Sequence, residues 1–242
     1  MKKHIPNTLT CCNLISGCLA TWFAFTELPS MALLFIIIGA AFDFLDGMVA
    51  RLLHVSSPIG KELDSLADCI TFGFAPSAIV FNYLSEYFYI HGGIIIPMLF
   101  FIAPFLAYLM AAFSAIRLAK FNLDERQTMG FIGLPTPANA LFWASLIAGD
   151  NFLDTLTLAP FIVLLGVFVS CWLLVSEIPM FALKFKTWGW KGNEIKYIFL
   201  VTCIPMLILL KISSLAAIIA WYVLLSLINK RQVSSFRPKT DA

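Results

Sequence analysis

Four aspartates that lie beside apolar sequence are the residues of this chain best suited to chemistry. Asp43 and Asp46 end one hydrophobic stretch, and Asp64 and Asp68 begin the next. A carboxylate at membrane depth costs about 2.5–3.5 kcal/mol, so it needs a neutralising partner. Four of them close together in the sequence therefore predict a site that attracts positive charge.

The spacing along the chain predicts that these carboxylates face one another. On a helix, residues three, four and seven positions apart share a face. One such face of the first stretch holds two aspartates and two small residues: Asp43, Asp46, Gly47 and Ala50. Asp64 and Asp68 share a face of the second stretch in the same way. The segment 54–60 contains Pro58 and Gly60, which predict a turn that brings the two helices together.

Converging carboxylates indicate divalent cations, because without them the carboxylates would repel one another. An all-oxygen set of ligands suits Mg²⁺ or Mn²⁺ rather than zinc. Two such ions about 3.5–4 Å apart can stabilise both oxygens of a displacement at phosphorus. We therefore predict divalent cations and a substrate that contains phosphate. The alternative is that Arg51, Lys61 and water satisfy the aspartates at a helix end, which suits one or two carboxylates better than four.

The elements that must position these residues are membrane helices. Of the 242 residues, 60% are apolar and 12% are charged, and the mean hydropathy is +0.90. These values predict an all-α polytopic membrane bundle. The net charge of +2 gives no indication of a nucleic-acid partner. Eight stretches suit transmembrane helices: Leu9–Thr26, Met31–Leu53, Leu66–Ser85, Ile94–Phe113, Phe131–Ala148, Leu156–Ser176, Tyr197–Leu210 and Ser213–Ile228.

The basic residues predict the orientation of these helices. If both termini are cytoplasmic, 15 of the 16 lysines and arginines lie on the cytoplasmic side, and the exception is Lys211. The opposite loops carry mainly acidic residues: Glu27, Glu86, Asp150 and Asp154. The aspartates then lie near the cytoplasmic surface. We expect an integral membrane protein of a bacterial cytoplasmic membrane, with its active site facing the cytoplasm.

The pattern D-x2-D-G-x2-A-R-x8-G-x3-D-x3-D in this stretch resembles the signature of the CDP-alcohol phosphotransferase family. Eight residues fill it without departure: Asp43, Asp46, Gly47, Ala50, Arg51, Gly60, Asp64 and Asp68. The resemblance implies one membrane domain over residues 1–242. Its catalytic core would be six helices within residues 1–185, followed by two additional helices within 195–230. The family often forms homodimers, so a homodimer is expected as well.

The resemblance also implies a role for each residue of the motif. Asp43, Asp46 and Asp64 would bind the two cations, and Asp68 would be the catalytic base as well as a possible metal ligand. The nucleotide and phosphates of a CDP-linked lipid would lie against Gly47, Ala50, Arg51 and Gly60. Three polar residues early in the chain are further candidates for nucleotide contact or, alternatively, for capping a helix: Asn7, Thr10 and Asn13.

Three other segments resemble members of the family that use serine as the acceptor. They are IPNTLTCCNLISG near the N-terminus, RLAKFNLD at 117–124 and FIGLPTPANA at 131–140. The implied substrates are CDP-diacylglycerol and L-serine, in contact with membrane lipids. A serine carboxylate requires a cation, and Arg117, Lys120 and Asn122 are the candidates for this pocket. Their alternative role is to anchor the helix at the cytoplasmic surface.

Other interpretations stay open at this point. The acceptor of the same reaction could be glycerol 3-phosphate or an inositol phosphate, although such a substrate requires several converging cations. A cation transporter would explain intramembrane aspartates, but it would not explain the glycine, alanine and arginine at fixed offsets. A purely structural membrane subunit would tolerate Asp68→Asn, which an enzyme of this kind would not.

Overall fold

The computed structural model describes residues 4–91, 101–123, 131–149, 153, 156, 158–180, 189 and 193–228. Helices form almost all of this part of the chain. The helices are α1 (His4–Phe25), α2 (Pro29–Leu52), α3 (Pro58–Asp68), the π-helix η1 (Cys69–Phe74), α4 (Ala75–His91), the 3₁₀-helix η2 (Ala103–Tyr108), α6 (Leu109–Leu123), α7 (Thr136–Ala148), α8 (Ala159–Val175), α9 (Glu194–Leu210), the 3₁₀-helix η4 (Lys211–Ser213) and α10 (Ser214–Ile228). Two short strands, β1 (Phe131–Ile132) and β2 (Pro179–Met180), pair antiparallel.

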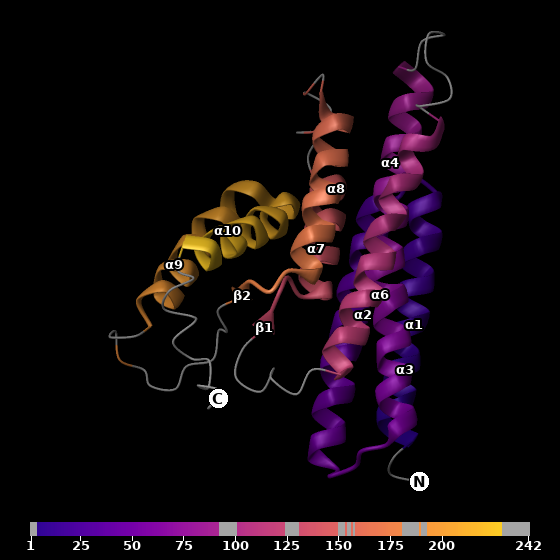
Figure 1. Ribbon diagram of the computed structural model, residues 1–242, viewed down its shortest axis with the longest axis vertical. Helices are drawn as coiled ribbons and strands as arrows, with labels where there is room; N and C mark the ends of the chain where they lie inside the picture. The colour runs from indigo at the N-terminus through magenta and orange to yellow at the C-terminus, as the bar shows by residue number, and fades with distance from the viewer. Residues whose placement is uncertain are drawn as a thin grey trace, which may run out of the picture.

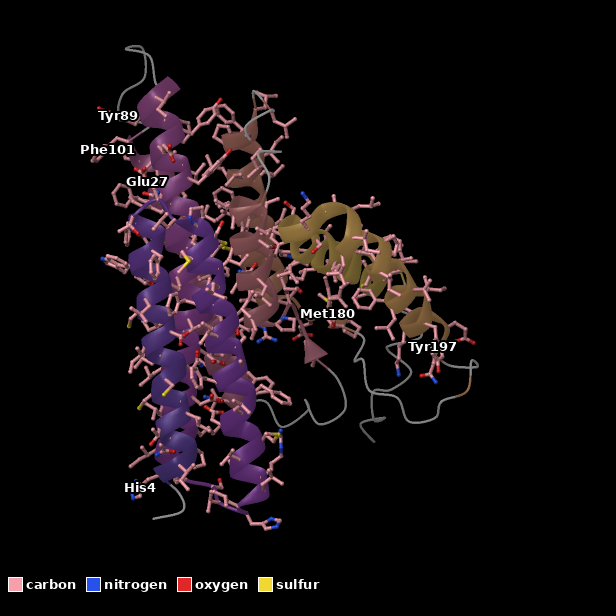
Figure 2. The ribbon with its side chains drawn as sticks, turned by 180° about the vertical axis from the view of Figure 1, so that it is seen from behind. His4, Glu27, Tyr89, Phe101, Met180 and Tyr197 are labelled. Atoms are coloured by element: carbon pink, nitrogen blue, oxygen red, sulfur yellow. The ribbon has the colours of Figure 1, made fainter. Side chains whose placement is uncertain are left out.

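The long helices run side by side along the longest axis of the molecule (Figure 1). Helices α1, α2, α6 and the continuous α3–η1–α4 form one bundle, with α1 packed against both α2 and α3. Helices α7 and α8 stand between this bundle and the tilted pair α9 and α10, and α10 packs against α7. Figure 2 shows His4 at one end of the bundle and Tyr89 and Phe101 near the other, so successive helices cross the long dimension in alternate directions.

The prediction of an all-α membrane bundle is confirmed. In the described part of the chain, five helical segments are long and apolar enough to cross a membrane, and α8 is a shorter apolar helix. Each of the eight predicted stretches contains a helix. Helix α7 has 13 residues. At about 1.5 Å per residue it is shorter than the hydrocarbon layer of a bilayer, which is about 30 Å thick.

The segment Glu194–Ile228 is long and apolar enough to cross a membrane, but it is a helical hairpin rather than one long helix. Lys211 has a φ of 45° and begins the turn between α9 and α10. The two helices pack against each other. The indole nitrogen of Trp221 donates a hydrogen bond of 3.0 Å to Thr202 Oγ1, and the rings of Phe199 and Tyr222 are 6.0 Å apart. The seventh and eighth predicted helices are therefore an antiparallel pair.

The third predicted helix was placed wrongly at its start. We expected it to begin at Leu66, but α3 begins at Pro58 and continues through η1 into α4. The Ser57 hydroxyl accepts a 3.0 Å hydrogen bond from the Gly60 amide, and proline follows at the first helical position. Hydropathy misses this amphipathic beginning, because Lys61, Glu62 and Asp64 make it polar.

The fifth predicted helix was also wrong at its start. Residues 131–132 form strand β1, and the helix begins only at Thr136. Gly133 has a φ of 73°, which favours glycine, and Pro135 precedes the first helical residue. Proline restricts the preceding residue to extended conformations, so the apolar run from Phe131 cannot be one continuous helix.

Candidate active site

Two neighbouring helices bring three of the four aspartates together. Asp43 lies on α2, and Asp64 and Asp68 lie on α3. One carboxylate oxygen of each lies within 4.8 Å of the others. Both helices pack against α1, which therefore holds the two carboxylate-bearing faces beside each other.

Asp46 lies outside this closest group and is bound to helix α1. The hydroxyl of Thr10 donates a 2.6 Å hydrogen bond to Asp46 Oδ2. The Asp46 side chain is buried, with 7% of its surface exposed. Asp46 and Asp64 line the same cavity, so the fourth aspartate belongs to the site but faces it from the side of α1.

Asp68 is also held by α1, through Asn13. The amide nitrogen of Asn13 donates a 3.1 Å hydrogen bond to Asp68 Oδ1, and the Asn13 side chain is fully buried. The Thr71 hydroxyl in turn donates a 3.0 Å hydrogen bond to the backbone carbonyl of Asn13. This chain of contacts fixes one oxygen of Asp68 and leaves its second oxygen for other partners.

Glycines allow the helices to approach closely behind Asp68. A Cβ atom at Gly17 would lie 2.7 Å from Thr71 Cα, and one at Gly39 would lie 2.5 Å from Thr71 Cγ2. Only glycine fits at both positions without movement of a neighbour. Thr71 belongs to the π-helix η1, which follows directly after Asp68. π-Helical turns are often found at functional sites.

A cavity of about 260 Å³ adjoins the aspartates. It is lined by residues of α1, α2, α3 and the turn between α2 and α3: Pro6, Asn7, Thr10, Asp46, Gly47, Ala50, Val55, Ser56, Ser57, Gly60, Lys61 and Asp64. A Cβ atom at Gly60 would lie 3.0 Å from Asn7 Oδ1, so this glycine makes room for the asparagine. At Gly47 a Cβ atom would meet nothing within 4 Å, because that position faces open space.

The aspartates suit a hard divalent cation. Asp64 Oδ1 is buried and has no hydrogen-bond partner among the described residues, which leaves it free to coordinate a metal. All the converging donors are carboxylate oxygens, the ligands that Mg²⁺ and Mn²⁺ prefer. Asp43, Asp64 and Asp68 are therefore the residues placed to hold a cation, with Asp46 beside them.

The structure also places the remaining residues of the motif. Gly47, Ala50 and Gly60 line the cavity, whereas Arg51 is exposed and lies outside the lining. Of the three polar residues predicted near the nucleotide, Asn7 and Thr10 line the cavity, and Asn13 contacts Asp68 instead. Several lining residues were missed by the sequence reasoning, among them Ser57 and Lys61. The cap-forming sequence Ser57-Pro58 was the available signal for the first of these.

The three residues predicted to bind serine lie in different surroundings. Arg117 is 8% exposed and interacts electrostatically with Asp68, whereas Lys120 is exposed. Asn122 joins α6 to α3, because its amide donates a 2.7 Å hydrogen bond to Ser65 Oγ and its backbone carbonyl accepts one of 2.9 Å from Lys61 Nζ. Arg117 therefore interacts with Asp68 through its charge, whereas Asn122 holds α6 against the part of α3 that bears Asp64.

This arrangement can bind a polyanion beside an acidic cluster. Carboxylates that hold divalent cations repel a phosphate until the cations are bound and attract it afterwards. The cavity is large enough for a phosphate-bearing group, and its walls supply hydroxyls, an amide and one lysine. Asp68 lies next to the carboxylates of Asp43 and Asp64 and is hydrogen bonded by Asn13, so it could take a proton from a second substrate.

Comparison with known proteins agrees with this chemistry. Residues 3–172 match the family model for CDP-alcohol phosphatidyltransferases. The chain is 36% identical over 203 residues to CDP-diacylglycerol–serine O-phosphatidyltransferase of Helicobacter pylori, covering 81% of this chain and 79% of the relative. It is 33% identical over 176 residues to the protein of the same name in Bacillus subtilis, covering 73% and 89%. A Mycobacterium tuberculosis protein of that name is 31% identical over 195 residues, covering 73% and 60%.

Proposed function

The chain belongs to the CDP-alcohol phosphatidyltransferase family, and we propose that it transfers the phosphatidyl group of CDP-diacylglycerol to L-serine, giving phosphatidylserine and CMP. The observation that carries this proposal is the group of three carboxylates within 4.8 Å, beside a cavity lined by Asp46, Gly47, Ala50 and Gly60 of the motif. The serine acceptor is supported by the names of the relatives. The family is generally dependent on divalent metals, which agrees with the acidic cluster.

We propose two divalent cations, Mg²⁺ or Mn²⁺, held by Asp43, Asp46, Asp64 and Asp68. When bound, they neutralise the diphosphate of the donor and stabilise charge on the oxygens around the reacting phosphorus. The cavity then receives the nucleotide end of the donor. Gly47 and Ala50 leave room for the phosphates along α2, and Asn7 and Thr10 supply polar contacts from α1. Arg51, at the exposed end of α2, would contact parts of the nucleotide that extend beyond the cavity.

The reaction on this geometry is a displacement at the phosphorus that carries diacylglycerol. The serine hydroxyl gives its proton to Asp68, and its oxygen forms a new bond to that phosphorus. The bond from the phosphorus to the bridging oxygen of the diphosphate breaks, and CMP leaves with this oxygen. Asn13 keeps Asp68 in one orientation through its hydrogen bond. Because a carboxylate is a weak base for an alcohol, positioning and electrostatics supply most of the rate enhancement.

The protein is an integral membrane protein. We propose that it lies in a bacterial cytoplasmic membrane, with both termini and the active site on the cytoplasmic side. In one domain of residues 1–242, the catalytic core would be residues 1–185, and residues 195–230 would add the hairpin. The family match at 3–172 and the packing of α10 on α7 support this division. A homodimer surrounded by membrane lipids is the proposed assembly.

The test is CMP release by the purified protein in detergent with CDP-diacylglycerol and Mn²⁺ or Mg²⁺. Serine, glycerol 3-phosphate, an inositol phosphate and no acceptor are compared. We expect release that depends on serine and on the metal and that is lost in Asp68→Asn. Release with only a different acceptor would replace serine and keep the mechanism. No release with any alcohol from folded protein would contradict the proposal.

A further inference from the structure

Three buried polar side chains near Asp68 have atoms without partners in the described part of the chain. Both polar atoms of the Asn139 amide lack a hydrogen bond, as do Ser114 Oγ and Arg117 Nε. Asn139 and Ser114 are fully buried, and Arg117 is 8% exposed. Leaving a buried donor or acceptor unsatisfied costs free energy. A polar ligand would remove this cost for all three side chains at once.

Helices α6 and α7 both pack against the π-helix η1, which directly follows Asp68. On α7, Ala140 belongs to the same buried cluster as Phe72 of η1, and Asn139 is its neighbour in the sequence. On α6, Ser114 contacts η1, since a Cβ atom at Gly73 would lie 3.1 Å from Ser114 Cβ. Asn139 and Ser114 therefore belong to helix segments that border η1.

The same segments lead to Asp68, which directly precedes η1. Arg117 lies three residues beyond Ser114 on α6, and the charges of Arg117 and Asp68 attract each other. Asn139, Ser114 and Arg117 thus lie on helices that pack against the element following Asp68.

We propose that Asn139, Ser114 and Arg117 form the inner wall of the acceptor site and recognise the amino-acid part of serine. The free Nε–H of Arg117 donates to the carboxylate. The carbonyl oxygen of Asn139 and the hydroxyl of Ser114 accept from the ammonium group. The serine hydroxyl is then left facing Asp68. Asn139 is then a specificity residue within the segment 131–140, and this assignment rests on the proposed function.

The experiment measures the KM for serine, the KM for CDP-diacylglycerol and the melting temperature of wild type, Asn139→Leu and Ser145→Ala. Ser145 is the matched control, because it is buried on the same helix but its hydroxyl bonds the backbone of that helix at Phe142. For Asn139→Leu we expect the KM for serine to rise by about tenfold or more. The KM for CDP-diacylglycerol should change by less than about twofold. Its melting temperature should not fall, because an unsatisfied amide is replaced by an apolar group of similar size. Ser145→Ala should keep both KM values.

A second variant tests the carboxylate contact. Arg117→Met should reduce the preference for serine over ethanolamine, which lacks the carboxylate, by about tenfold or more. An unchanged preference would overturn the assignment of Arg117. For Asn139→Leu, an unchanged KM for serine would contradict the assignment of Asn139 to the acceptor site. A lowered melting temperature with both KM values raised together would contradict it as well. Wild-type protein that shows no serine-dependent CMP release would instead contradict the proposed function itself.

Discussion

Asp68 is held at a single oxygen by a residue that is far away in the sequence. Asn13 donates to Asp68 Oδ1 across 55 positions of the chain, and Thr71 fixes the backbone of Asn13. A fully buried amide has little freedom to turn away. Loss of this contact should therefore disturb the chemical step more than the binding of the donor.

We predict that Asn13→Ala lowers kcat by about tenfold to a hundredfold, the value of one hydrogen bond to a charged group. The KM for CDP-diacylglycerol should change much less. Steady-state CMP release measures both. Thr8→Ala is the control, since its hydroxyl bonds the backbone of its own helix at His4. A raised KM for the lipid at unchanged kcat would instead favour the role in nucleotide binding expected from the sequence.

Metal binding by the carboxylates can be tested without turnover. We predict that Asp64→Asn weakens Mn²⁺ binding by at least about tenfold, because it removes a charged ligand whose Oδ1 has no other described partner. Titration of free Mn²⁺ by electron paramagnetic resonance measures this. Glu62→Gln, an exposed carboxylate on the same helix, should bind as wild type does. Equal affinity in both variants would contradict a metal site at Asp64.

For single residues, the sequence predicted which side chains share one helix face, but it did not predict contacts between segments that are far apart in the chain. Spacing predicted that the aspartates of α2 and α3 meet, and Asp43, Asp64 and Asp68 do. It did not indicate that Asp46 bonds Thr10 or that Asn13 bonds Asp68. Both contacts depend on how α1 packs, which helical periodicity does not specify.

At the scale of elements, the site depends on how closely α1, α2 and η1 approach one another. Gly17 and Gly39 face Thr71 from two different helices. A methyl group at Gly17 would push the π-helix away from α1, and one at Gly39 would push it away from α2. Asp68, which directly precedes the π-helix, would move with it. Gly47 is also on α2, but it faces open space beside the cavity. We therefore infer a packing role for Gly17 and Gly39 and propose a ligand-binding role for Gly47.

A pair of variants separates these two roles. We predict that Gly17→Ala destabilises the protein by about 1–3 kcal/mol through overpacking. Gly47→Ala should melt at or above the wild-type temperature, because alanine favours a helix by about 1 kcal/mol over glycine. It should nevertheless raise the KM for CDP-diacylglycerol. Thermal unfolding in detergent and initial rates measure these effects. A large loss of stability in Gly47→Ala would contradict the open space at that position.

Helices were predictable from apolarity, and their interruptions were not. The start of α3 at Pro58 is set by a cap, and the start of α7 at Thr136 is set by Gly133 and Pro135. These are local signals that a search for apolar stretches passes over. The π-helix η1 has no comparable signal, because its sequence CITFGF is as apolar as a regular helix.

At the scale of the whole molecule, large apolar side chains cover the outer surface. They include Trp22 on α1, Phe161 and Leu165 on α8, and Ile208 on α9, all about half exposed or more. A surface of this kind is stable in lipid and not in water. The charged site therefore lies inside a body whose outside is apolar.

The orientation of this body in the membrane is a separate prediction. We expect Glu27→Cys to react with a membrane-impermeant maleimide from outside the cell, and Ser56→Cys only after the cytoplasmic side is exposed. The background has its six native cysteines replaced by alanine and should not react. The turn containing Glu27 precedes α2, and the segment containing Ser56 follows it, so the two lie at opposite ends of this helix. Labelling of both from one side would refute the proposed topology.

The central claim is that the oxygen of serine attacks the phosphorus of the donor, with Asp68 as the base. Serine labelled with ¹⁸O in its hydroxyl tests this most directly, when the products formed from CDP-diacylglycerol are analysed by mass spectrometry. Our account predicts that wild-type protein forms phosphatidylserine that retains the label, that the CMP is unlabelled, and that Asp68→Asn forms neither product at a measurable rate. Phosphatidylserine without the label, or equal product formation by Asp68→Asn, would contradict it.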